Sequence, residues 1–284
     1  MLEFEESFFK REVRDGHLVG ELVKKAWAVQ LNMLAEIDDI CKKYDLTYFA
    51  YWGTLIGVRH QGFIPWDDDI DIALPRPDYT RFLEIASQEL SSEYYILSSE
   101  VDGWDNSFSR LIHGDEICWN EEFLTRNYNC PFALGIDIFP LDYISSDKRE
   151  AEEQKQLAMQ ISSVLTVLKE RKRLEAEGAE EKVIQEMNNS IASCLVYLED
   201  VCGVRFDGNV SLAKQLNILY DQVASLFGEN ESDNLTSFSN YLKNGYVVKK
   251  EWFERIERVP FENITIPIPV GYDNILRKSH GNYT

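Results

Sequence analysis

The stretch GTLIGVRHQGFIPWDDDIDIALPRPDY, residues 53–79, places four aspartates within five positions and then turns apolar. Residues 67–69 are all aspartate, and Asp71 follows after one isoleucine. Successive side chains of a strand point to opposite faces, so Asp69 and Asp71 would share one face of a strand here. The opposite face is apolar and carries Ile70, Ile72 and Leu74. The alternation therefore predicts a strand that is anchored in the core and presents carboxylates side by side.

A second strand of the same build is predicted in LGIDIFPLDYI, residues 134–144, where Asp137 lies between two isoleucines. If the two strands are neighbours, Asp137 joins Asp69 and Asp71 in a site of three carboxylates, with Asp67 adjacent. Hard divalent cations such as Mg²⁺ prefer carboxylate oxygens and retain waters for substrate phosphates. The pattern thus predicts a Mg²⁺ site, with catalytic roles for the three carboxylates.

Two other interpretations of the acidic run compete with a metal site. The aspartates can form a solvated edge, because charged residues usually face water. They also fit the first ligand positions of an EF-hand loop, but that loop requires a glycine at its sixth position and a bidentate glutamate at its twelfth. Ile72 and Asp78 stand there in this chain, with Pro75 and Pro77 between them. The EF-hand is therefore rejected, and the solvated edge stays open.

Gly53 and Thr54 follow a predicted strand, LTYFAYW at residues 46–52, and open a short helix. Glycine lets a backbone approach a phosphate, and the N-terminal amides of a helix favour anions. Arg59 and His60 lie between this turn and the acidic strand, where an arginine can bind phosphate oxygens through two hydrogen bonds. An ordinary turn, a surface ion pair for Arg59 and a structural role for His60 are the simpler alternatives.

The remaining elements follow from periodicity and from the placement of proline and glycine. An amphipathic helix is predicted over residues 18–44, with a buried stripe of Leu22, Trp27, Leu31, Leu34 and Ile37. A helix is expected from Pro77 onward, and the strand that contains Asp137 should end at Pro140, which cannot donate to a ladder. Residues 147–227 show helical spacing and predict two or three helices with a charged turn near 175–181. Further strands are predicted at 94–99, 107–113, 116–120, 258–262 and 264–270, and a last helix at 272–279.

The chain of 284 residues is long enough for one elaborated domain. Its net charge of −20 argues against a nucleic-acid partner, because phosphate backbones require a basic surface. Five scattered cysteines, an odd number, do not suggest a disulfide framework, and the first residues lack the pattern of a signal peptide. These features predict a cytoplasmic protein and leave its oligomeric state open.

The strand, the Gly-Thr turn, the helix and the Asp-Ile-Asp strand together resemble the nucleotidyltransferase superfamily. Residues 53–79 are similar in particular to the signature of the LicD family of phosphocholine transferases. GIDIFPLDYI, residues 135–144, resembles the second motif of that family, and VPFENITIPIPVGYDNILRKSHGNY, residues 259–283, resembles its C-terminal motif. The resemblance brackets residues 46–144 and 246–284 and leaves out the helical segment between them.

This resemblance implies a Mg²⁺-dependent enzyme that transfers phosphocholine from CDP-choline to a hydroxyl of a glycan, in a teichoic acid precursor or a surface polysaccharide. Relatives use CDP-ribitol or similar donors, so transfer of ribitol phosphate or glycerol phosphate stays open. The resemblance also implies metal ligation by Asp69, Asp71 and Asp137. Gly53 and Thr54 would contact the phosphates of the donor.

The C-terminal motif matches the family at Tyr272, Asp273, Lys278, Gly281 and Tyr283. Tyr272 and Lys278 are therefore expected to bind substrate. The chain departs from the family at His280, where an aromatic residue is commoner, and at Asn282, where an aspartate is usual. In the implied in-line displacement, Lys278 or Arg110 would stabilise the phosphoryl oxygens. Asp137 would take the proton of the attacking hydroxyl.

The expected fold class is α+β, with a nucleotidyltransferase-like mixed sheet flanked by helices and a helical insert. Residues 1–146 would form the catalytic core with its N-terminal helix, 147–245 the insert, and 246–284 strands and a helix that return to the core. Two rival functions stay open: nucleotidyl transfer from a nucleoside triphosphate, and an idle scaffold in glycan assembly. A lipid-linked acceptor would bring the chain to the inner face of the membrane.

Overall fold

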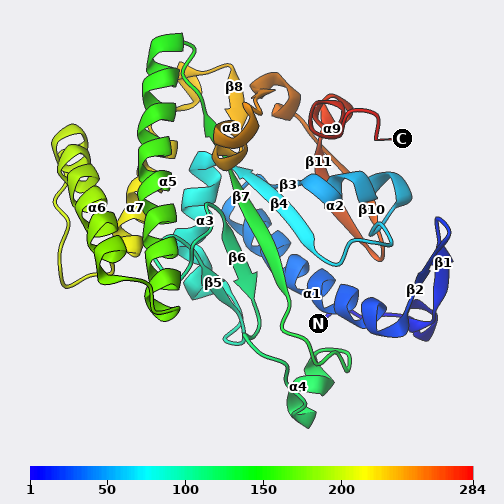
Figure 1. Cartoon of the computed structure of the whole chain (residues 1–284). Helices are drawn as coiled ribbons and strands as arrows, with labels where there is room; N and C mark the ends of the chain where they lie inside the picture. Colours follow the sequence, from blue (N-terminus) through cyan, green and yellow to red (C-terminus); the bar gives the residue numbers. More distant parts are fainter. Residues whose placement is uncertain (284) are drawn as a thin grey trace. The chain divides into compact units, whose positions relative to one another are not determined.

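The computed structural model describes residues 1–283 and divides into two compact units (Figure 1). The first unit comprises Met1–Leu97, Phe108–Leu141 and the chain from Val247 onward. The second unit comprises Ser98–Ser107 and Asp142–Tyr246. The acidic stretch and the C-terminal motif thus belong to one unit, although more than a hundred residues separate them in the sequence.

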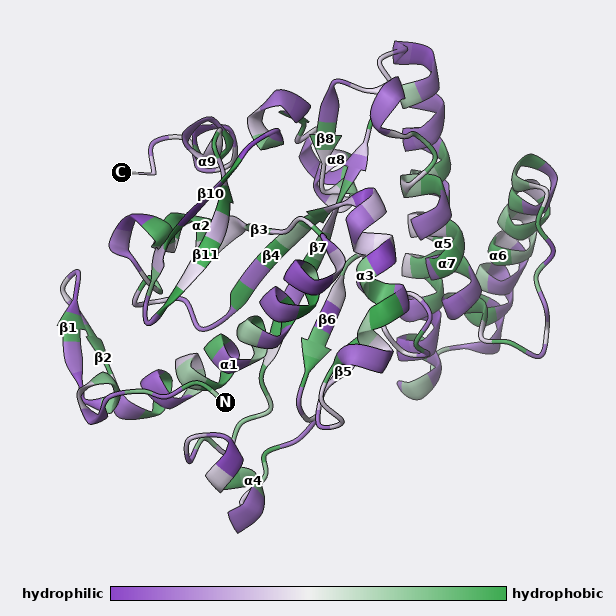
Figure 2. Ribbon diagram, turned by 180° about the vertical axis from the view of Figure 1, so that it is seen from behind, coloured by the Kyte–Doolittle hydropathy of each residue, from purple (hydrophilic) through white to green (hydrophobic). Residues whose placement is uncertain are grey.

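A mixed sheet forms the centre of the first unit. Its strands follow the order β3 (Phe49–Ala50), β4 (Ile70–Pro75), β7 (Gly135–Tyr143), β6 (Ser109–Ile112) and β5 (Tyr95–Leu97). β4 and β7 are parallel, and the other neighbours in this order are antiparallel. Helices α1 (Glu21–Tyr44) and α3 (Arg76–Glu89) cover one face of the sheet in both views (Figures 1 and 2). The prediction of a mixed sheet flanked by helices is confirmed.

The core of the first unit contains the isoleucines that alternate with the aspartates. The side chains of Ile70, Ile72, Ile136 and Ile138 are fully buried. Burial of such a side chain contributes about 1.5–3 kcal/mol to folding, which secures both acid-bearing strands. On α1 the expected stripe is buried except at its start, where Leu22 is 43% exposed. The burial of Leu22 is wrongly predicted, since it lies exposed in the first turn of α1. The helix also begins later than predicted, at Glu21, because the β-hairpin of β1 (Glu12–Arg14) and β2 (His17–Val19) precedes it.

The Gly-Thr turn and the C-terminal segment lie side by side. Helix α2 (Trp52–Gly57) and the 3₁₀ turn η2 (Val58–His60) precede the acidic loop. The predicted C-terminal strands are β10 (Ile256–Phe261) and β11 (Ile264–Pro269), and the predicted helix is α9 (Tyr272–His280). β11 lies next to β3, and α9 lies next to α2. The tail therefore packs around the start of the acidic motif.

The second unit consists mainly of helices. α5 (Lys148–Ala176), α6 (Glu181–Cys202) and α7 (Leu212–Ala224) confirm the predicted helical segment, with the charged turn at residues 177–180. Their shared core includes Ile161, Val164, Ile191, Leu198 and Leu216. The end of β7 pairs here with β8 (Asn234–Thr236), and α8 (Phe238–Asn244) follows. Within residues 1–283, no helix is both long enough and apolar enough to span a membrane.

Two strand predictions fail for identifiable reasons. Residues 116–120 form no strand, because Ile117 and Trp119 are 58% and 74% exposed and Asn120 instead caps the short helix α4 (Glu121–Arg126). β7 does not stop at Pro140 but continues to Tyr143. Its pairing with β6 ends at Ile138, so proline stands where no ladder bond to β6 is needed.

An ion pair between a buried aspartate and a partly exposed arginine holds the C-terminal hairpin to α1. The two terminal nitrogens of Arg258 on β10 donate to the two carboxylate oxygens of Asp38 on α1 at 2.9 and 3.0 Å, and the hydroxyl of Tyr48 donates to Asp38 at 2.8 Å. Burial raises the pKa of Asp38, but hydrogen bonds from Lys42, Arg258 and Tyr48 lower it. The pKa of Asp38 therefore lies below its usual value. The pair thus joins segments more than two hundred residues apart.

Arg258→Met should lower the free energy of unfolding by about 1–3 kcal/mol, because it removes a charge-assisted pair of hydrogen bonds from a buried carboxylate. Urea denaturation of this variant, of Asp38→Asn and of the double variant gives the coupling energy between the two positions. We expect a coupling of at least about 1 kcal/mol. Strictly additive effects of the two substitutions would contradict the assignment.

Candidate active site

Strand register aligns three charged side chains across neighbouring strands. Asp71 on β4 is the register partner of Asp137 on β7, and Asp137 is in turn the partner of Arg110 on β6. Directly opposed residues on adjacent strands project from the same face of a sheet. Asp71, Asp137 and Arg110 therefore form one row across the sheet, on the face opposite to the buried isoleucines.

Asp69 completes the group from the loop that leads into β4. Carboxylate oxygens of Asp69, Asp71 and Asp137 all lie within 4.8 Å of one another. Asp137 is 7% exposed, and the other two are partly buried. The geometry brings together the three residues that the sequence singled out. Closely spaced carboxylate oxygens with little other neutralisation fit a hard divalent cation that completes its shell with water or phosphate.

Asp71, Asp67 and Asp137 have pKa values above that of an ordinary aspartate. Burial raises the pKa of Asp71 to about 8, and the charges of Asp69, Asp137 and Asp67 raise it further, while Arg110 lowers it. Burial and a hydrogen bond with Asp69 raise the pKa of Asp67 to about 7. Burial also raises the pKa of Asp137, against the opposing effect of Arg110. Ionising the whole group without a cation is thus costly, as expected for like charges in a poorly solvated place.

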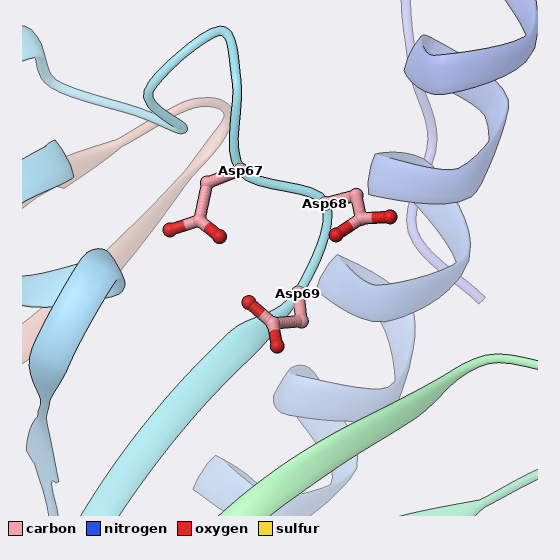
Figure 3. A group of neighbouring side chains, drawn as sticks. All are labelled: Asp67, Asp68 and Asp69. Carbon is pink, nitrogen blue, oxygen red and sulfur yellow. The ribbon is translucent and has the colours of Figure 1, made fainter.

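Side chains of helix α1 hold the acidic loop by donating hydrogen bonds to the backbone carbonyl groups of the loop. The buried side-chain amide of Gln30 donates to the carbonyl of Asp68 at 2.8 Å, and the indole of Trp27 donates to the carbonyl of Asp67 at 3.4 Å. Figure 3 shows Asp68 directed towards the α1 ribbon, while Asp67 and Asp69 project to the other side of the loop. The backbone anchors leave the side chains of Asp67 and Asp69 available to the site.

Gly53 and Thr54 lie in the first turn of α2, against the acidic residues. The hydroxyl oxygen of Thr54 accepts a hydrogen bond from the backbone amide of Asp71 at 2.9 Å. A Cβ atom built at Gly53 would lie 1.9 Å from a carboxylate oxygen of Asp67, so any other residue there would displace that carboxylate. Beyond the predicted contact with phosphate, these two residues therefore shape the position of Asp71 and Asp67.

Arg59 and His60 are exposed and have separate partners. The guanidinium of Arg59 lies over the ring of Tyr283, 5.1 Å from its centre, and the hydroxyl of Tyr283 donates to Asp273 at 2.6 Å. Nδ1 of His60 lies 3.0 Å from a carboxylate oxygen of Asp15 in the β1–β2 turn. Arg59 is thus connected to the C-terminal motif, and His60 to the N-terminal hairpin.

The other two predicted tail residues lie at opposite ends of one helix. Tyr272 begins α9 and is partly buried, while Lys278 is exposed in its last turn. Arg277, which the sequence analysis did not select, pairs with Asp273 one turn earlier at 2.8 Å. The spacing of four residues on a helix was the available signal for that pair.

Arg110 has a partner that the sequence did not reveal. Its Nε and one terminal nitrogen donate to the two oxygens of Asp137, the second bond measuring 2.8 Å. From the sequence, Arg110 is expected to contact phosphoryl oxygens instead. The pairing depends on the register of β6 against β7, two strands separated by more than twenty residues, for which the sequence carries no local signal.

Comparison with known proteins finds similarity over the part of the chain that contains this site. Residues 45–163 match the family model described as LicD/FKTN/FKRP, nucleotidyltransferase domain. The lipopolysaccharide cholinephosphotransferase LicD of Haemophilus influenzae is 44% identical over 73 residues, which are 25% of this chain and 28% of that protein. An uncharacterized protein of Rickettsia typhi is 34% identical over 79 residues, 28% of this chain and 25% of that protein.

The matched segments span about a quarter of the length of these curated relatives. The family model includes Asp69, Asp71, Arg110 and Asp137, the residues that the register brings together. The part of this chain that carries the acidic site, residues 45–163, is therefore similar to the LicD family.

Proposed function

We propose that this chain is a Mg²⁺-dependent transferase that moves phosphocholine from CDP-choline to a hydroxyl of a cell-surface glycan. The observation that carries the proposal is the convergence of Asp69, Asp71 and Asp137 within the segment that is similar to the LicD family. The similarity to the Haemophilus relative, a lipopolysaccharide cholinephosphotransferase, supports phosphocholine as the transferred group and a glycan as the acceptor. The proposal extends that relative's activity to this chain.

The three carboxylates are the residues that would hold the metal. A Mg²⁺ ion bound there would neutralise charge on the donor's pyrophosphate as the phosphorus–oxygen bond to CMP breaks. Thr54 fixes the Asp71 backbone, and Gly53 leaves room for the Asp67 carboxylate. These contacts hold the carboxylates in place before substrate arrives, so that little reorganisation is needed during the reaction.

The proposed reaction also requires a group that accepts the proton of the acceptor hydroxyl. Asp137 is the base expected from the sequence, and both of its oxygens accept hydrogen bonds from Arg110. Arg110 lowers the pKa of this carboxylate, but burial raises it more, so its pKa lies above the usual value and Asp137 can still accept a proton. Arg59 and Lys278, both exposed on the α2–α9 side of the unit, remain the cations proposed for the donor's phosphates.

Nucleotidyl transfer is the second candidate function, because the matched family model is described as a nucleotidyltransferase domain. It would use the same carboxylates on a nucleoside triphosphate and release pyrophosphate. Ribitol phosphate or glycerol phosphate transfer would retain the proposed mechanism and change only the alcohol. A teichoic acid precursor is an alternative acceptor to lipopolysaccharide, and we place the reaction in the cytoplasm, at the inner face of the membrane.

Asp71→Asn should abolish turnover, with a loss of at least about a thousandfold, because it removes one of the three carboxylates proposed to hold the metal. The same change should stabilise the metal-free protein. The pKa of Asp71 is raised from 3.8 to about 8 on folding, so its contribution to stability falls as pH rises through that window. At pH 8 the variant should gain roughly 1–3 kcal/mol in the free energy of unfolding.

Urea denaturation with EDTA at pH 5 and pH 8 measures this gain, which should be larger at pH 8. Asp39→Asn, an exposed carboxylate on α1, is the matched control and should change neither turnover nor the pH dependence. Full activity of Asp71→Asn would refute the role of this carboxylate in the proposed metal site.

Metal binding should strengthen as pH rises from 6 to 8.5. The cation competes with protons on Asp67 and Asp71, whose pKa values are raised to about 7 and about 8. Isothermal titration of Mn²⁺ at pH 7 in buffers of different ionisation enthalpy should report the release of about one to two protons per ion bound. An affinity that does not change with pH would contradict the assignment of these carboxylates.

The donor is identified by titrating CDP-choline, CDP-ribitol, CDP-glycerol, CTP and ATP with and without Mg²⁺. We expect Mg²⁺-dependent binding of CDP-choline that exceeds that of the other CDP-alcohols at least tenfold, and release of CMP when a glycan acceptor is supplied. Preference for another CDP-alcohol would change the transferred group. Preference for a triphosphate, with release of pyrophosphate, would establish nucleotidyl transfer instead.

A further inference from the structure

Arg110 contacts the acidic site through hydrogen bonds to the carboxylate of Asp137. Its guanidinium donates two hydrogen bonds, one to each oxygen of that carboxylate. The Asp137 side chain is 9% exposed, whereas the Arg110 side chain is 38% exposed. The guanidinium therefore lies on the solvent side of the Asp137 carboxylate and covers it.

The absence of a side chain at Gly135 leaves space for the Arg110 side chain. A Cβ atom built at Gly135 would lie 3.0 Å from both Cγ and Cδ of Arg110. Gly135 precedes Asp137 by two residues on β7 and so shares its face of the strand. The aliphatic part of Arg110 thus lies over the strand in the space that a side chain would fill. This close fit favours one conformation of the arginine and limits its freedom to reach elsewhere.

The two-point contact fixes the plane of the Asp137 carboxylate. A planar guanidinium that binds both oxygens defines the rotation of the carboxylate as well as its position. Each carboxylate oxygen has more than one site for an incoming partner, so an oxygen bonded to Arg110 can still ligate a cation. Asp137 can therefore be oriented by Arg110 and bind metal at the same time.

We propose that Arg110 is a positioning residue that orients Asp137 for divalent cation binding, and not a ligand of the donor's phosphate. This inference rests on the proposed metal site and deepens it. The two possible roles of Arg110 predict opposite changes in cation affinity when the arginine is removed. By Coulomb's law alone, removal of a positive charge beside a cation site should strengthen cation binding. Loss of a partner that orients a metal ligand weakens it, typically 10–100-fold.

The test is isothermal titration of Mn²⁺, without nucleotide, into wild-type protein, Arg110→Met and Arg110→Lys. Titration at pH 8.5 favours the ionised form of the carboxylates, because it lies above the pKa of about 8 of Asp71. We expect both variants to bind about 10–100-fold more weakly than wild type, since lysine keeps the charge but lacks the planar fork. Arg81→Met, which removes an arginine that is 55% exposed on α3, is the matched control for net charge and should bind as wild type does.

Circular dichroism of the metal-free variants should match wild type, which separates loss of a metal ligand's orientation from loss of the fold. Binding by Arg110→Met that equals or exceeds wild type would overturn the inference and leave the metal site intact. Full binding by Arg110→Lys would show that charge alone suffices and would also overturn it. Wild-type protein that binds no Mn²⁺ would overturn the proposed metal site, and the positioning role with it.

Discussion

Mutual repulsion among Asp69, Asp71 and Asp137 is the constraint on which the site depends. Three carboxylates whose oxygens lie within 4.8 Å of one another destabilise a fold unless something compensates for them. The chain supplies three kinds of compensation: buried isoleucines on the opposite face of the strands, one arginine on Asp137, and protons retained on Asp71 and Asp67. Hydrophobic burial on one face of the sheet thereby stabilises an unfavourable charge arrangement on the other.

These groups neutralise the negative charge of the carboxylates only in part. A single guanidinium balances one carboxylate of the group, so the remaining acidic groups favour either protons or a cation. Because Asp71 and Asp67 have pKa values near neutrality, the exchange of protons for a divalent ion requires little free energy at physiological pH. A site neutralised fully by arginines would be more stable and would have less affinity for metal.

Much of this arrangement was predictable because it depends on local periodicity. Alternation of isoleucine and aspartate gave both acid-bearing strands and the face on which the carboxylates lie, and helical spacing gave α1 and the helices of the second unit. The failures involve tertiary context. Segments distant in the sequence decide whether residues 116–120 pair with a neighbouring strand. They also decide whether β6 extends far enough to pair beside Pro140. The partner of Arg110 belongs to the same class, since register between strands has no local signal.

The C-terminal motif has a structural task that its sequence did not suggest. The loop between η2 and the acidic run is held by the turn of the β10–β11 hairpin. The Glu262 carboxylate accepts hydrogen bonds from the Phe63 amide at 3.1 Å and from Arg14 at 2.5 Å, and the Glu262 amide donates to the Gln61 carbonyl at 2.7 Å.

Phe261, the residue before this turn, is fully buried, and its ring centre lies 5.2 Å from that of Phe63. The chain that enters the acidic run is thus clamped by residues about two hundred positions later. Helix α1 holds the following carbonyls from the other side through Gln30 and Trp27. Positions 67–69 are therefore fixed between two distant segments of the chain, which explains how a loop, and not a regular strand, can present carboxylates in a defined arrangement.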